Sequence, residues 1–65
     1  MKKWVIRFRV IAPSDYLTPM MYLPIEETIE SANTADEAWE SFVTEKGAAP
    51  RDWYRKIEIY ELKEG

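Results

Sequence analysis

The beginning of the chain alternates between apolar and other side chains. From Lys3 to Ile11 every second residue is large and apolar, so one face of an extended chain would be buried against a core. The apolar phase holds Trp4, Ile6, Phe8 and Val10, and the opposite phase holds Lys3, Val5, Arg7, Arg9 and Ile11. The pattern predicts a half-buried strand over residues 3–11.

Two later stretches show the same alternation less regularly. Residues 21–30 predict a second strand whose apolar phase is interrupted by Glu27, which a bulge or a sheet edge would explain. The two phases are Leu23, Ile25 and Ile29 against Tyr22, Glu26, Thr28 and Glu30. Pro24 cannot donate a ladder hydrogen bond, so this strand belongs at an edge. Residues 54–63 alternate again and predict a third strand.

The segment between these strands, SANTADEAWESFVTEKG (31–47), has the pattern of a complete helix. Thr34 and Glu37 stand in the spacing of a capping box, in which each side chain satisfies the other residue's amide. Gly47 marks the end. The apolar stripe is Ala35, Ala38, Trp39, Phe42 and Val43, and the polar face is Asp36, Glu37, Glu40, Ser41 and Thr44.

The order strand, strand, helix, strand predicts a single small α+β domain over residues 1–65. The helix must return the chain to the end at which the second strand began, so the second and third strands run parallel to each other. The first strand has the most regular pattern and no proline, so we place it at the centre of the sheet. This gives a three-stranded sheet of order 2-1-3 with the helix on one face. On the open face we expect Arg7 and Arg9 to lie among Glu26, Glu30 and Glu58.

Composition narrows the chemistry that the domain can perform. Nine aromatic residues favour a packed core over disorder. The chain has no histidine or cysteine and only two glycines, which removes the usual zinc ligands, Cys/His nucleophiles and Gly-rich phosphate loops. A chain of 65 residues also leaves little room for a cleft that excludes water. We therefore predict a protein that is not an enzyme and has no cofactor and no metal.

The first ten residues, MKKWVIRFRV, do not read as a targeting segment. Arg7 and Arg9 interrupt the apolar run, and no small-residue cleavage site follows it. We therefore expect neither a signal peptide nor a membrane partner. The absence of cysteine suits a reducing compartment, and the predicted location is the cytoplasm, which would be that of the host cell if a phage encodes the chain.

Charge is strongly segregated along the chain. The net charge of -3 divides into +4 for residues 1–9, -8 for residues 10–45, which contain no lysine or arginine, and +1 for residues 46–65. Acidic residues on the helix and the second strand could present a phosphate-like surface to a cationic groove, bind a divalent ion, or simply be solvated. The candidate contacts are Glu26, Glu30, Asp36, Glu37 and Glu40.

The segment APSDYLTPMMYLP (12–24) is a second candidate for binding. It joins two strands that should form a hairpin, yet it puts roughly eight to ten residues between them, where ordinary hairpin loops have about two to five. Its apolar side chains suit a binding surface, but they could equally fold back over the end of the core as an Ω-like loop. The candidate contacts are Tyr16, Leu17, Met20 and Met21.

Two further surfaces have weaker signals. Trp53 and Tyr54, flanked by Arg51, Arg55 and Lys56, could stack on nucleic-acid bases, but no RNA-binding motif is present and the net charge is negative, so the sequence argues against direct nucleic-acid binding. The open sheet face could support self-association as a homodimer. Its candidate residues are Val5, Ile11, Tyr22, Tyr60 and Leu62.

The stretch IESANTADEAWESFVTEKG (29–47) resembles the small ββαβ proteins of bacteriophages and other mobile elements. In these proteins a strand ends, a Thr or Ser caps a helix that reads D-E-A-W/L, and a short strand closes the chain. The group includes inhibitors of host RNA polymerase and of defence nucleases, among them anti-CRISPR proteins. The resemblance implies a non-enzymatic inhibitor or modulator of a host protein, and the alternative is a homo-oligomeric accessory domain.

Overall fold

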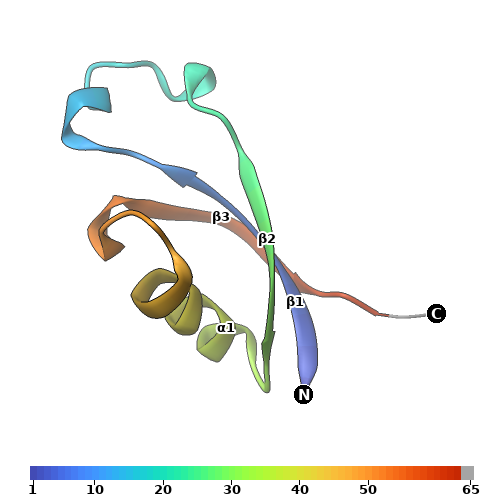
Figure 1. Cartoon of the computed structure of the whole chain (residues 1–65). Coiled ribbons are helices and arrows are strands. Elements are labelled where there is room, and N and C mark those ends of the chain that lie inside the picture. Colours follow the sequence, from blue (N-terminus) through green and yellow to red (C-terminus); the bar gives the residue numbers. More distant parts are fainter. Residues whose placement is uncertain (64–65) are drawn as a thin grey trace.

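The computed structural model describes residues 1–63 and confirms the predicted α+β architecture (Figure 1). A three-stranded sheet of order β2-β1-β3 carries one helical layer on one face. The main elements are β1 (Lys2–Val10), β2 (Glu26–Ala32), α1 (Ala35–Ser41) and β3 (Tyr54–Glu61). Both outer strands are antiparallel to β1, so β2 and β3 run parallel to each other as predicted.

The core lies between the helix-facing side of β1 and the helical layer. Ile6 is fully buried, and Phe8 lies beside Phe42 and Tyr54, with ring centroids 4.8 and 5.5 Å away. The indole of Trp4 covers one end and donates from Nε1 to the carbonyl of Ala32 at 3.1 Å. Aromatic rings therefore supply most of the volume of this small core.

The predicted face assignment of β2 is wrong. Arg7 lies opposite Glu27 and Glu58 and forms ion pairs with them at 3.8 and 3.5 Å, whereas Glu26 and Glu30 lie on the helix side of the sheet. Glu27 therefore does not interrupt a buried phase, because its phase is the solvent-facing one. The bulge is in β3, where Ile57 is the extra residue between two β1 pairings.

The helix begins as predicted and ends differently. The Thr34 hydroxyl accepts from the Glu37 amide at 3.2 Å, but the Glu37 carboxylate accepts from the Asn33 amide at 3.4 Å and not from that of Thr34. After Ser41 the α-helix widens into a π-helix over Phe42–Lys46. Wider turns of this kind change the direction of side chains within a helix.

Gly47 follows the helical layer, and steric contact with Tyr54 explains why this position requires glycine. Its φ of -71° is open to any residue, so a left-handed cap is not what requires glycine here. A Cβ at this position would lie 2.3 Å from the Tyr54 Oη and 2.7 Å from the adjoining ring carbon. The same hydroxyl accepts from the Ala49 amide at 3.0 Å. The close approach of Gly47 lets the Tyr54 ring stay in the core.

We expect Gly47→Ala to destabilise the domain by about 1–3 kcal/mol, because the ring of Tyr54 must move or the 47–50 segment must lift away. Urea denaturation followed by circular dichroism would measure the change. Ala48→Gly is the matched control, since it exchanges the same two residue types at the exposed neighbouring position. An unchanged midpoint for Gly47→Ala would contradict the steric explanation.

Candidate functional site

The loop between β1 and β2 projects beyond the end of the helical layer (Figure 1). We call residues 11–25 the tip loop. It is longer than predicted, because β2 begins at Glu26 and not near residue 21. Two short 3₁₀ turns shape it, Pro13–Asp15 and Met20–Tyr22, and each begins at or directly after a proline. Since proline fixes φ, the turns restrict the loop before any partner is bound.

Local hydrogen bonds hold the tip loop in this shape. The Asp15 carboxylate accepts from the Ala12 amide at 3.1 Å, and the Leu23 amide donates to the Met20 carbonyl at 3.0 Å. At the base, Arg9 Nε donates to the Leu23 carbonyl at 3.4 Å and the Ile11 amide donates to the Trp53 carbonyl at 2.8 Å. The only charged side chain of the loop is therefore used internally, and the loop is tied to the sheet at both ends.

The large apolar side chains of the tip loop face solvent. Leu17 is 98% exposed and Met21 79% exposed. Tyr16, Met20, Tyr22 and Ile25 are exposed as well. None of the described core residues belongs to the loop except Ile11 at its base, so the loop does not fold back over the core. Of the two alternatives that the sequence left open, the structure shows the exposed one. A contiguous exposed set of this kind is typical of an interaction site.

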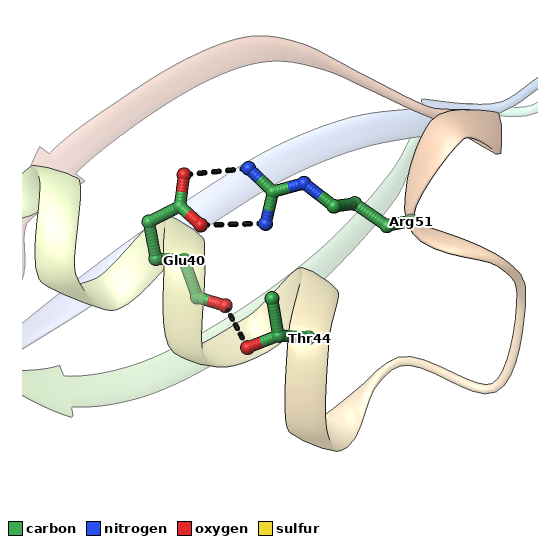
Figure 2. Close-up of polar contacts among 3 residues, drawn as sticks. All are labelled: Glu40, Thr44 and Arg51. Carbon is green, nitrogen blue, oxygen red and sulfur yellow. Dashed lines mark hydrogen bonds and ion pairs between the residues drawn. The ribbon is translucent and has the colours of Figure 1, made fainter.

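The acidic candidates do not form one continuous surface of unpaired carboxylates, because two of them are already paired with basic side chains. Glu40 forms a two-pronged ion pair with Arg51, with contacts of 2.5 and 2.7 Å (Figure 2). The Thr44 hydroxyl donates to the main-chain carbonyl of Glu40 in the same view. The hydrogen bonds from Arg51 hold the pKa of the Glu40 carboxyl below its usual range, so this group stays charged but is already neutralised.

Glu30 is not available to a partner. Its side chain is 6% exposed, and the Lys46 ammonium lies 2.8 Å from its Oε1, which has no further hydrogen-bond partner among residues 1–63. Thr28 Oγ1 donates to Oε2 at 3.4 Å. The partner carboxylate raises the pKa of Lys46. The prediction that Glu30 is a surface contact is wrong, because its side chain is buried.

The other acidic candidates do not form one cluster, because Asp36 and Glu37 lie in the first turn of α1 and Glu26 begins β2. Glu37 is exposed but caps the helix, and Asp36 is exposed in the first turn. Glu26 is exposed at the opposite end of β2. Within the part of the chain that the structure describes, no three acidic side chains come together in a way that could hold a metal ion. On the predicted acidic face of the helix, only Asp36 and the partly engaged carboxylate of Glu37 are thus left to contact a partner.

The open sheet face is also different from the predicted one. Val5 and Ile11 are buried, with exposed fractions of 3% and 8%, and Tyr22 lies in the tip loop. Tyr60 and Leu62 are partly exposed as expected. Ile29 and Ile57 were not among the predicted residues of this face, yet they expose 53% and 42% of their surface. Both residues alternate with charged residues in the outer strands, and this pattern could have placed them on the open face.

The comparisons with known proteins give no relative. No protein-family model, no curated protein and no solved structure matches this chain. Among the described residues, no helix is long and apolar enough to cross a membrane. The tip loop therefore stands on its geometry alone as the candidate site.

Proposed function

We propose that this protein is a non-enzymatic binding module that inserts its tip loop into an apolar recess of a partner protein. One observation carries the proposal: the loop is held by prolines and internal hydrogen bonds, yet it presents its largest apolar side chains to solvent. A side chain such as Leu17 gains no stability for the fold in that position. Burial against a partner would recover the hydrophobic free energy that folding leaves unused.

The construction of the loop favours affinity. Ordering a flexible loop on binding costs conformational entropy, and a loop that is already ordered avoids most of this cost. Tyrosine side chains have few rotatable bonds for their contact area, and methionine adapts to irregular surfaces. Tyr16 and Tyr22 on either side of Leu17, Met20 and Met21 combine both properties.

Apolar docking replaces charge mimicry as the leading mechanism. Glu30 and Glu40 are already paired with Lys46 and Arg51, so few unpaired acids remain for a cationic groove. The resemblance of residues 29–47 to host-directed phage proteins supports a single host protein as the partner and inhibition or modulation as the outcome. Buried apolar contacts are insensitive to salt, whereas contacts between exposed charges are screened.

Tagged protein can test this in a nuclease-treated bacterial lysate, with a Leu17→Glu/Met21→Glu variant beside the wild type. The matched control is Ile57→Glu, which places the same charge at an exposed apolar position outside the loop. We expect wild type and control to retain one near-stoichiometric protein in 1 M salt, and the tip variant to bind it at least tenfold more weakly, since anchor residues dominate binding.

Two results would overturn the proposal. Equal retention by the tip variant would place the contact elsewhere, and elution of the partner from wild type by moderate salt would favour the exposed acids Glu26, Asp36 and Glu37. Amide spectra of each variant should keep the dispersion of the wild type, because the substituted side chains make no core contacts.

A further inference from the structure

The outer edge of β3 is open. In the sheet order β2-β1-β3 this strand is hydrogen-bonded to β1 alone among the described elements. The Leu62 amide donates to the carbonyl of Lys3 at 2.8 Å, so the alternation of an antiparallel ladder turns the main-chain groups of Ile59 and Glu61 away from β1. The strand contains no proline. These outward amides and carbonyls are free to pair with another extended chain.

A recess lies at the beginning of β3, where Tyr54 and Arg55 form part of its lining. It has a volume of about 420 Å³ and combines the apolar side chains of Trp39 and Val43 with the ring of Tyr54. The charged residues Arg51, Asp52 and Arg55 complete its wall. We call this hollow the β3 recess. A strand that pairs with Ile59 and Glu61 would reach the recess where it continues along β3 toward Tyr54.

The β3 recess has a basic rim on an acidic protein. Lys56 places its ammonium 5.8 Å from the centroid of the Trp39 ring. Arg55 donates from Nη1 to the carbonyls of Asp52 and Tyr54, which fixes its guanidinium at the mouth of the recess. Arg51 is neutralised by Glu40 (Figure 2), so Arg55 and Lys56 outweigh the single carboxylate of Asp52.

We propose that the β3 edge and the β3 recess together bind an extended acidic peptide, which adds to the sheet as a fourth strand. Main-chain pairing with Ile59 and Glu61 supplies affinity that does not depend on sequence. Side chains alternate along an extended peptide, so every second residue lies on the helix side of the sheet, and those beside Tyr54 and Arg55 reach the recess. Carboxylates at those positions meet Arg55 and Lys56, and a small apolar residue meets Trp39 and Val43. This surface is independent of the tip loop.

A single-stranded nucleic acid would use the same cations but not the edge of the strand. Phosphates and bases can contact Arg55, Lys56 and Trp39, whereas they cannot continue the main-chain ladder of β3. Protection of outward-facing amides therefore separates a peptide strand from an anion that merely occupies the recess.

The test uses isotope-labelled full-length protein and a blocked peptide TETVTETV, in which threonines occupy one face of the strand and glutamate and valine share the other. We expect hydrogen exchange at the amides of Ile59 and Glu61 to slow at least tenfold at saturation. The same peptide with lysine in place of glutamate should bind at least tenfold more weakly. Arg55→Glu/Lys56→Glu should weaken binding of the acidic peptide by tenfold or more, while Lys63→Glu, an exposed charge reversal outside the recess, should not.

Each contrary result overturns the proposal. Equal binding of the lysine peptide would remove the acidic specificity, and binding without protection of Ile59 and Glu61 would remove strand addition. Saturation by an oligonucleotide or inorganic polyphosphate with no response to the peptide would assign the recess to phosphates. Protection that appears without peptide and rises with protein concentration would mean that a second copy pairs along β3.

Discussion

Phe42→Ala is expected to leave most of the chain unfolded at 25 °C. Phe42 is 6% exposed, and its ring centroid lies 4.8 Å from that of Phe8, 5.1 Å from that of Tyr54 and 6.3 Å from that of Trp39. Removing a buried phenyl group costs about 3–5 kcal/mol. A single core of this size rarely supplies more than about 3–5 kcal/mol of stability in total. The substitution therefore removes about as much free energy of unfolding as the domain has.

Near-ultraviolet circular dichroism and amide spectra would show the loss of fixed packing. Tyr60→Ala serves as the control, because it removes an aromatic ring that is 44% exposed on the other face of the sheet. If Phe42→Ala kept a cooperative urea transition close to that of the control, the aromatic cluster would not be the centre of stability.

Lys46→Met is the second substitution for which we expect a large effect. It removes the charge that faces the buried carboxylate of Glu30 at 2.8 Å and leaves that carboxylate inside the protein without a counter-charge. We expect the melting temperature to fall by at least roughly 10 °C, because each kcal/mol lost is worth about 4–8 °C in a domain of this size. The double variant Glu30→Met/Lys46→Met should recover most of the loss, because it buries no unpaired charge.

The pH dependence gives a second check on this pair. Glu30 raises the pKa of Lys46, so the contribution of the ammonium is complete below the ordinary pKa of lysine and is lost only as the pH rises through the higher folded-state value. In Lys46→Met this alkaline loss should be absent, because the ammonium that titrates is gone. A variant that melts like the wild type at neutral pH, or that loses as much stability as the wild type at alkaline pH, would contradict this account.

The strand order was predictable because local signals determine it. Thr34 and Glu37 define where the helix begins, and the regular alternation around Ile6 identifies the central strand. The face of β2 was not predictable from the same rules. The alternating set Glu26, Thr28 and Glu30 is polar and therefore predicts a face that points to solvent. The burial of Glu30 is compensated by the charge of Lys46, which belongs to a different element. Pairings between distant parts of the chain do not appear in local periodicity.

The candidate site was predictable in composition but not in conformation. Tyr16, Leu17, Met20 and Met21 are apolar in any reading, yet the sequence does not say whether they turn inward or outward. The outcome depends on the turns that begin around Pro13 and Pro19 and on the hydrogen bond from Arg9 to the Leu23 carbonyl. The pairing of Glu40 with Arg51 is likewise set by the path of the chain after the helix.

The separation of the tip loop from the core has an evolutionary consequence. The molecule measures 40 × 23 × 15 Å, and the side chains of Leu17 and Met21 make no contribution to the aromatic cluster around Phe42. Under the proposed function, substitutions at these two positions would alter the binding surface with little change in the population of folded protein. A binding specificity carried by the tip loop could therefore change one residue at a time, while every intermediate remains a folded protein.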